Sequence, residues 1–237
     1  MTQIPLYFLP GTQCNDRLWQ KVFELLPAHF APMALTIPDA NSPLAIVKAL
    51  HQQLPTQPIN LIGFSLGGYL SALYATQYPE SISRLMIIAN HPHPLPNKEL
   101  VTREFTLGFI RKNGYRGLPL SRIHGLLAPI NHHKQNIIDT INLMDKECGE
   151  KTLVNQMQYT SQRENLMPAI NQAPFSTHFV IGDNDALVAI DKLSQAIKHP
   201  NVSLEMIQQC GHMSPLEDPA AIAQSIINHF KTARDNV

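Results

Sequence analysis

The sequence predicts an α/β fold, with a mostly parallel sheet of about six strands flanked by helices. Two features of the 237-residue chain predict this class. Short apolar runs of strand length alternate with longer segments whose apolar residues recur at helical spacing. A Gly63-Phe64-Ser65-Leu66-Gly67 turn also leads directly from an apolar run into a helical pattern. Helical crossovers join successive strands of one sheet in parallel, so a parallel sheet follows.

Four strands and three helices are predicted before residue 90. Each strand is an apolar run that ends at glycine, proline or other turn residues. Ser42 and Pro43 suit the N-cap and the first position of a helix, and Pro79 ends the helix that follows Ser65. The expected strands cover 6–9, 32–37, 59–62 and 84–89, and the helices begin near residues 16, 43 and 66.

The alternation stops after Asn90, and no strand is predicted before about Ala173. Helical patterns take its place, at residues 97–112, 119–128, 133–147 and 150–164. We therefore expect a core formed by residues 1–90 and 174–237, with an all-helical insertion at 91–173. Ligands of open α/β sheets bind at the C-terminal edge of the strands, where this insertion would lie. A lid over that edge is the favoured interpretation, and helices that only cover the sheet are the alternative.

The strand–helix alternation resumes in the last part of the chain. Strands are predicted at 178–181 and 202–207, with a helix near 190–198 between them. Asp218 suits the N-cap of a final helix that runs from Pro219 to about Thr232. The turns after the two strands carry Asp183, Asp185 and His212, so these side chains are expected at the C-terminal edge of the sheet.

Bulk composition excludes several classes of protein. Hydrophobic residues make up 44% of the chain and the formal net charge is zero, so no electrostatic surface for nucleic acid or an anionic membrane is expected. No apolar run approaches the ~20 residues of a membrane span. The start of the chain lacks a basic segment followed by a long apolar one, so no signal peptide is predicted. Three widely separated cysteines form no disulfide or metal framework, and the cytoplasm is the simplest location.

Ser65 is the candidate nucleophile. A strand, a tight turn with a serine at its apex and a helix form the context of a nucleophile elbow. Side chains at positions 63 and 67 would collide with the turn or the neighbouring strand, which explains the two glycines. An ordinary Gly/Ser turn is the alternative, and the rest of a catalytic triad decides between them.

A serine hydroxyl needs a base to take its proton and a third group to orient that base. His212 follows a strand in a Gly-His loop and is the candidate base. Asp183 and Asp185 both lie in the turn after the preceding strand, and either could orient the histidine. Cys14 and Cys210 lack an elbow and a base of their own, so we interpret them as small packing groups.

Three motifs together resemble the α/β-hydrolase superfamily over essentially the whole chain. They are Gly63-x-Ser65-x-Gly67-Gly68, Gly182-Asp183-Asn184-Asp185 and Gly211-His212-x-x-x-x-Glu217-x-Pro219. The similarity is to small members with a lid: carboxylesterases, pimeloyl-carrier methyl ester esterases and the menaquinone-pathway succinyl-cyclohexadiene carboxylate synthases. It implies that the acid is Asp185, the last position of Gly-x-x-Asp.

The oxyanion hole needs two backbone N–H donors. One is expected from Leu66, the residue after the nucleophile. The resemblance places the other after the first strand, usually following a His-Gly pair. This chain has Pro10-Gly11 there, so the second donor maps to Thr12, with Gln13 as the neighbouring alternative.

The chain departs from the menaquinone-pathway pattern at Tyr69, where those enzymes usually carry arginine. Arg122 and Arg163 could instead bind a substrate carboxylate, although solvated surface positions are the commoner use of arginine. His91-x-His93 and His132-His133 lack a nearby carboxylate or cysteine set, so no metal is expected.

The sequence therefore predicts a serine hydrolase that cleaves a small-molecule carboxylic ester and needs no cofactor. The same triad could act on a thioester or carrier-bound acyl group, or on a carbon acid as a lyase or C–C hydrolase, because fold does not fix function. A ligand-binding protein without catalysis is a further alternative. The oligomeric state and the substrate's acyl chain are left open.

Overall fold

The computed structural model describes residues 3–231, and its centre is one six-stranded sheet. All neighbouring strands are parallel, in the order β2-β1-β3-β4-β5-β6. The predicted six-stranded parallel sheet is thus confirmed. The strands are β1 (Ile4–Leu9), β2 (Phe30–Ala34), β3 (Ile59–Phe64), β4 (Ile82–Ile88), β5 (Ser176–Gly182) and β6 (Val202–Ile207).

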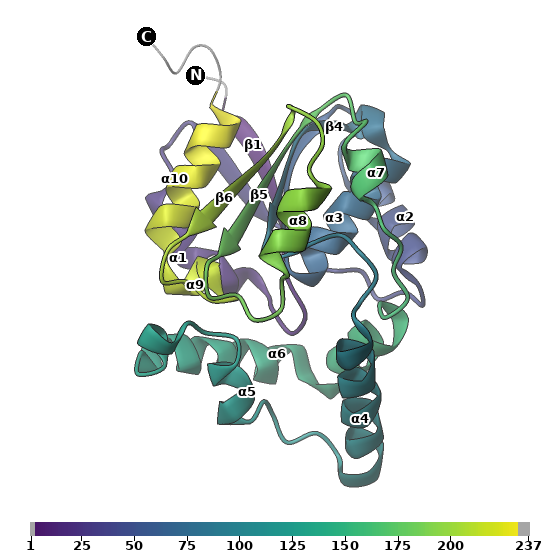
Figure 1. Cartoon of the computed structure of the whole chain (residues 1–237), viewed down its shortest axis with the longest axis vertical. Coiled ribbons are helices and arrows are strands. Elements are labelled where there is room, and N and C mark those ends of the chain that lie inside the picture. Colours follow the sequence, from purple (N-terminus) through teal and green to yellow (C-terminus); the bar gives the residue numbers. More distant parts are fainter. Residues whose placement is uncertain (1–2, 232–237) are drawn as a thin grey trace.

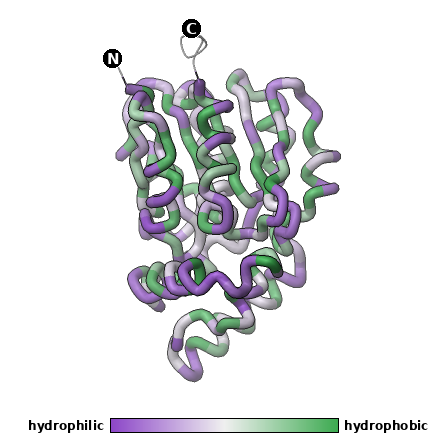
Figure 2. The backbone as a smooth tube through the Cα atoms, turned by 90° about the vertical axis from the view of Figure 1, so that its left-hand side faces the viewer, coloured by the Kyte–Doolittle hydropathy of each residue, from purple (hydrophilic) through white to green (hydrophobic). Residues whose placement is uncertain are grey.

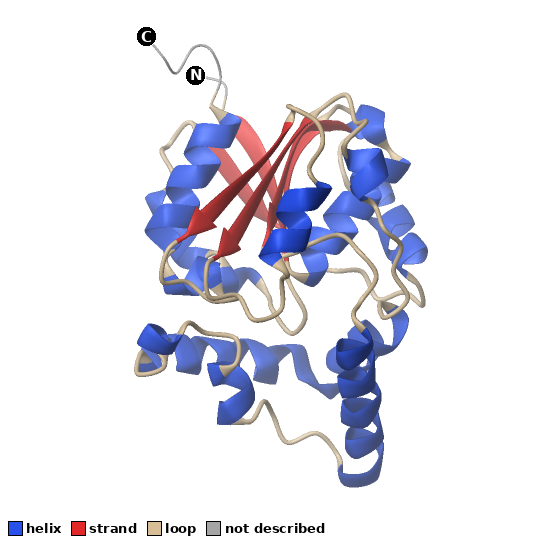
Figure 3. Cartoon of the chain, viewed as in Figure 1, coloured by secondary structure: helices blue, strands red, loops and turns tan. Residues whose placement is uncertain are grey.

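Helices cover both faces of the sheet (Figures 1 and 3). One face packs against α1 (Gln20–Leu25) and α10 (Pro219–Phe230). The other packs against α2 (Pro43–Gln53), α3 (Leu66–Gln77) and α8 (Ile190–Ala196). Successive side chains of a strand point to opposite faces, so a strand buried on both sides reads as a continuous apolar run. This explains why β3 and β4 are apolar throughout their centres.

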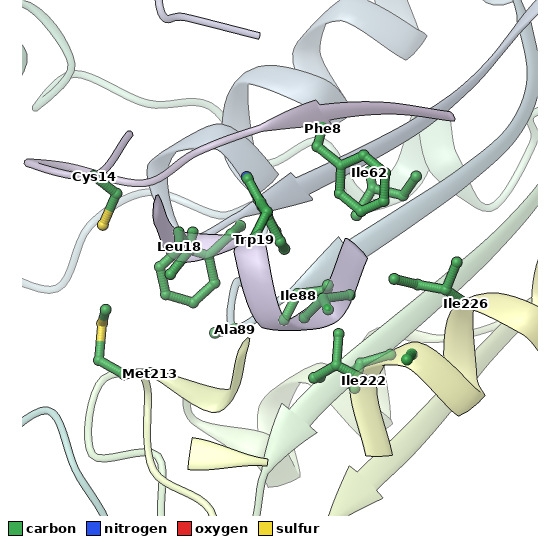
Figure 4. Close-up of a cluster of buried hydrophobic side chains, with 14 of the residues drawn as sticks. Phe8, Cys14, Leu18, Trp19, Ile62, Ile88, Ala89, Met213, Ile222 and Ile226 are labelled. Atoms are coloured by element: carbon green, nitrogen blue, oxygen red, sulfur yellow. The ribbon is translucent and has the colours of Figure 1, made fainter. Parts of the chain in front are cut away.

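Aromatic side chains fill the core beneath α1 (Figure 4). Trp19 meets the ring of Phe8 edge to face, with 5.0 Å between the ring centroids. Phe64, the last residue of β3, also meets Trp19 edge to face, at 6.3 Å. Figure 4 shows Ile222 and Ile226 of α10, which covers the same face of the sheet, beside this cluster. Phe64 directly precedes Ser65, so this packing fixes the strand end that carries the serine.

The described segment between β4 and β5 contains helices and loops but no strand. The helices are α4 (Asn97–Asn113), α5 (Leu120–His124), the 3₁₀ turn η3 (Pro129–Asn131), α6 (Gln135–Tyr159) and α7 (Met167–Ile170). The arrowheads of the sheet point toward α4, α5 and α6 (Figure 3), and these helices form a separate layer in the turned view of Figure 2. These helices, called the insertion below, therefore lie at the C-terminal edge of the strands.

The segment labelled α6 contains the two helices that the sequence separates at 147–150, with a kink between them. Gly149 breaks this helix, with φ 75° and ψ 174°. Glycine adopts such a positive φ without the steric cost that other residues meet. The predicted division of this segment into two helices is thus confirmed, with the break at Gly149.

Other boundaries differ where periodicity is weak. β2 covers Phe30–Ala34 instead of 32–37, and it is an edge strand, where Pro32 is tolerated without an N–H to donate. The first helix splits into a 3₁₀ turn η1 (Asp16–Leu18) and α1. α10 ends at Phe230, and Thr232 lies outside the described residues. Four short elements were not predicted because they span too few residues to show a period: η2 (Pro79–Ser81), η3, α7 and α9 (Ser214–Glu217).

The predicted N-caps are confirmed. Ser42 Oγ accepts a hydrogen bond from the N–H of Ala45 at 3.2 Å, and Pro43 is the first residue of α2. Asp218 Oδ1 accepts one from the N–H of Ala221 at 2.9 Å at the start of α10. Among residues 3–231, none of the helices combines the length and the apolar character that a membrane span requires.

Candidate active site

Ser65 stands between β3 and α3 in a conformation that side chains rarely adopt. Its φ is 51° and its ψ is −114°. Such a conformation costs about 1–3 kcal/mol and persists only where the surroundings impose it. Here the N–H of Ser65 donates to the carbonyl of Ile88 at 2.9 Å, and its carbonyl accepts from the N–H of Tyr69 at 3.1 Å. The serine is therefore fixed at the apex of a sharp turn, with the N-terminus of α3 behind it.

The glycines on both sides of Ser65 are sterically required. A Cβ at Gly63 would lie 2.4 Å from the carbonyl oxygen of Gly67 and 2.4 Å from Ser71 Oγ. A Cβ at Gly67 would lie 2.3 Å from two carbonyl oxygens at the end of β1. The neighbouring backbone cannot move away from both contacts, so only glycine fits these positions, as predicted from the sequence.

Three predicted residues from three strand ends meet in one chain of hydrogen bonds. His212 Nε2 lies 2.9 Å from Ser65 Oγ, and His212 Nδ1 lies 2.9 Å from Asp185 Oδ2. His212 and Asp185 are buried, whereas Ser65 is partly exposed. Asp185 is itself fixed, because its Oδ1 accepts from the N–H groups of Leu187 and Val188. The arrangement has the geometry of a nucleophile, a base and an orienting acid.

The structure distinguishes Asp183 from Asp185, either of which could orient the histidine according to the sequence. Asp183 Oδ1 accepts hydrogen bonds from Asn184 Nδ2 at 2.6 Å and from the N–H of Cys210 at 3.2 Å. It thus ties two loops together, and among the described contacts it does not reach His212. Asp185 is the residue that the structure brings to the histidine.

The loop after β1 passes directly beside the serine. A Cβ at Gly11 would lie 3.1 Å from Ser65 Cβ. In the part of the chain that the structure describes, no hydrogen bond engages the N–H of Thr12 or of Leu66. The N–H of Gln13, the alternative donor, is occupied by Gln156 Oε1 at 3.0 Å. Among the described contacts, the N–H groups of Thr12 and Leu66 thus have no protein acceptor, unlike the N–H of Gln13.

Glu217 belongs to the Gly211-His212 motif, but the sequence did not predict what its carboxylate contacts. Its buried carboxylate accepts from the N–H of Gly211 at 3.0 Å through Oε1. Oε2 accepts from the N–H of Ala128 and from Asn131 Nδ2, both at 2.7 Å. The N–H of His212 also donates to the carbonyl of Leu126 at 2.8 Å. The histidine loop and the insertion are thus joined, and the signal available in the sequence was an acid five residues after a Gly-His pair.

The cysteines beside the site are buried thiols. Burial raises the pKa of Cys14 to about 12, with a smaller contribution from Cys148. Burial, followed by Glu217 and Asp218, raises the pKa of Cys210 to about 12. Both thiols stay protonated at neutral pH, which matches their interpretation as packing groups.

The other singled-out residues lie around the site without joining the triad. The guanidinium of Arg163 lies 4.7 Å from the ring centroid of Tyr69, in the first turn of α3. Burial, followed by the charge of Arg103, lowers the pKa of Arg163 to about 9. Burial, followed by His93, lowers the pKa of His91 to about 4. Among the described residues, no group of three or more His, Cys, Asp or Glu side chains could hold a metal ion.

A cavity of about 330 Å³ lies within the insertion, between α4, α6 and residues 114–122. Its volume is at the lower end of the range for ligand sites, about 300–1,000 Å³. The triad residues do not line it. Its walls are mostly apolar, and three arginines also contribute: the lining includes Phe105, Phe109, Ile110, Leu153, Met157, Arg103, Arg116 and Arg122.

A parallel sheet with a serine elbow, and an acid and a histidine at later strand ends, defines the α/β-hydrolase class. The family model described as alpha/beta hydrolase fold matches residues 36–219. Because this match covers well over half of the chain, the chain belongs to the alpha/beta hydrolase fold family. The predicted superfamily is confirmed.

Relatives agree with this assignment. The biotin biosynthesis bifunctional protein BioHC of Teredinibacter turnerae is 28% identical over 95% of this chain, which spans only 44% of that protein. The 2-succinyl-6-hydroxy-2,4-cyclohexadiene-1-carboxylate synthase of Enterobacter sp. (strain 638) is 24% identical, covering 92% of this chain and 88% of the synthase. A thermophilic esterase from Thermogutta terrifontis has the same fold, with a TM-score of 0.82 at 19% identity over 96% of this chain and 89% of the esterase.

Proposed function

We propose that this protein is a serine hydrolase that cleaves a carboxylic ester through an acyl-enzyme. The observation that carries the proposal is the hydrogen-bonded chain from Ser65 through His212 to Asp185, with both distances at 2.9 Å. Strain at Ser65 and burial of the other two side chains support it, because groups held in this way are organised before a substrate binds.

The reaction follows from the atoms in place. Ser65 Oγ attacks the carbonyl carbon while its proton passes to His212 Nε2. The N–H groups of Leu66 and Thr12 stabilise the tetrahedral oxyanion. The C–O bond to the alcohol breaks, and His212 returns the proton to the leaving oxygen. Water then attacks the acyl-enzyme with His212 again as base, and the acid and free Ser65 are released. Asp185 holds the imidazole through its contact with His212 Nδ1.

We also propose that the insertion, residues 91–173, acts as a lid that shapes the substrate site. Its position beyond the strand ends, where ligands of open α/β sheets bind, supports this role. The contacts of Glu217 with Ala128 and Asn131 support a close connection between this segment and the histidine loop.

A second candidate reaction uses the same triad on a carbon acid, and the Enterobacter relative is named as a synthase of a cyclohexadiene carboxylate. One observation favours it. The chain carries Tyr69 where such enzymes usually have arginine, yet the guanidinium of Arg163 lies over that tyrosine ring at 4.7 Å. A cation beside the elbow would attract a substrate that carries a carboxylate.

The test is hydrolysis of p-nitrophenyl esters from acetate to a long-chain acid, by the wild type and by Ser65→Ala. Loss of a triad nucleophile lowers kcat by orders of magnitude, about 10⁶-fold where it has been measured. Wild-type turnover that disappears in Ser65→Ala supports the ester hydrolase, and the best chain length sizes the acyl site. Absence of turnover with every ester contradicts it, and thioesters and carbon acids are then the next substrates.

A further inference from the structure

The side chain of Gln13 lies in the break of helix α6, although the two segments are far apart in sequence. Gln13 is 4% exposed. Its Nε2 donates to Asp145 Oδ1 at 2.9 Å and lies 3.3 Å from the carbonyl oxygen of Gly149. Its backbone N–H donates to Gln156 Oε1 at 3.0 Å. Both halves of α6 and the break itself therefore hold this one residue of the β1 loop.

Asp145 is a buried carboxylate on the insertion, 3% exposed, and it makes no ion pair among the described residues. Neutral donors surround it instead. Tyr115 OH and Gln13 Nε2 both donate to Oδ1, and the N–H of Leu118 donates to Oδ2 at 3.2 Å. Burial, followed by Asp145, raises the pKa of Tyr115, so this phenol stays a donor at neutral pH. A buried carboxylate is costly unless its bonds are made, so these donors fix its position.

Gln13 is also the residue after Thr12, and its φ of 54° is one that side chains rarely adopt. The turn is short, because the N–H of Cys14 donates to the carbonyl of Gly11 at 3.2 Å. Gly11 in turn is the residue that approaches Ser65. A strained backbone of this kind persists only where its surroundings hold it, and here Asp145 and Gln156 provide the hold.

We propose that Gln13 and Asp145 are positioning residues that aim the N–H of Thr12 at the oxyanion. This inference rests on the proposed function, since it assumes acyl transfer at Ser65. It assigns a second task to the insertion. Helix α6 covers the strand ends. It also fixes the loop after β1, which supplies one of the two oxyanion donors.

The test compares Gln13→Ala, Asp145→Asn and the double variant with the wild type, Ser65→Ala and the control Asp139→Asn. Asp139 is an exposed acid on the same helix, bonded only to Gln135 among the described residues. Two quantities are measured with a p-nitrophenyl ester: kcat per active site, counted from the p-nitrophenol burst, and KM. The third is the Ki of an alkylboronic acid, whose tetrahedral adduct with Ser65 places an oxygen in the oxyanion hole.

Misplacement of one oxyanion donor predicts a fall in kcat per active site of about 10–100-fold, with KM unchanged within about 2-fold. The boronic acid Ki should rise by the same factor as kcat falls. The kcat of the double variant should equal that of the single variant with the lower kcat, because both residues act through one loop. A purely structural role would lower the number of competent sites and leave both kcat per site and Ki at wild-type values, which would overturn the inference.

Failure of the proposed function looks different, because then the wild type shows no turnover or Ser65→Ala retains it. If Gln13→Ala and Asp145→Asn do not fold, Tyr115→Phe decides. It removes one donor to Asp145 from a partly buried position and should lower kcat and boronate affinity together by about 2–5-fold. Wild-type kcat and Ki in Tyr115→Phe would then overturn the inference.

Discussion

Glu217→Gln tests how strongly the buried carboxylate joins the insertion to the histidine loop. Glu217 Oε2 accepts from two donors and Oε1 from one, the N–H of Gly211. In the variant, the amide oxygen accepts from the two Oε2 donors, the N–H of Ala128 and Asn131 Nδ2. The amide nitrogen then faces the N–H of Gly211, which loses its acceptor. A buried N–H without an acceptor costs about 1–3 kcal/mol. The two remaining bonds also lose their charged acceptor, about 1 kcal/mol each.

The expected loss in the free energy of unfolding is therefore roughly 3–5 kcal/mol, in the range for breaking a buried charged contact. Urea unfolding measures it as a lower midpoint with an unchanged slope. Glu24→Gln, an exposed acid on α1, is the control and should stay within about 0.5 kcal/mol of the wild type. The esterase kcat of Glu217→Gln should fall by about 10-fold or more, since the Gly211–His212 loop loses its anchor. A change below about 1 kcal/mol with unchanged kcat would refute this reasoning.

Three further predictions follow from the site and the core. Asp185→Asn should lower kcat by about 10⁴-fold in the p-nitrophenyl assay while Asp183→Asn stays within a few fold, because only Asp185 contacts the base. Gly67→Ala should fail to give soluble folded protein, as judged by circular dichroism, because its Cβ would lie 2.3 Å from the backbone at the end of β1. Gly108→Ala, in open space within α4, should gain about 0.5–1 kcal/mol in urea. Burial, followed by His178, lowers the pKa of His229 to about 3 from 6.5. Below pH 6.5 the unfolded chain therefore binds a proton at His229 that the native state does not bind. The free energy of unfolding should reach its full value above pH 6.5 and fall below it by up to about 1.4 kcal/mol per pH unit. His229→Gln should flatten that slope in urea titrations carried out at several pH values.

The parts of the fold that the sequence predicts well are those with strong periodic burial. β3 and β4 lie in the middle of the sheet and are buried on both faces, so their apolar runs stand out. β2 is an edge strand with a mixed burial pattern, and its predicted ends were wrong by two or three residues. The parallel direction of the strands also agreed, because strands of one sheet that are joined through helical crossovers run in the same direction.

The proximity of Ser65, His212 and Asp185 could be predicted because each lies at the end of a strand, and parallel strands end at the same edge. The choice between Asp183 and Asp185 could not come from spacing alone. Both face the same turn, and their difference is which loop each carboxylate reaches. The resemblance to a known family supplied that choice, and the geometry supports it.

The contacts between the insertion and the catalytic loops were beyond reach of the sequence for a physical reason. Gln13 and Asp145 are 132 residues apart, and Ala128 and Glu217 are 89 apart, so no local period connects them. Each contact pairs a buried carboxylate on one side with backbone or amide donors on the other, and the two carboxylates come from opposite sides, one from the core and one from α6. Neither half of the interface is satisfied without its partner. An insertion exchanged for that of another family member would therefore have to keep both sets of donors and acceptors, and not only its apolar face, to leave the loops around Ser65 in place.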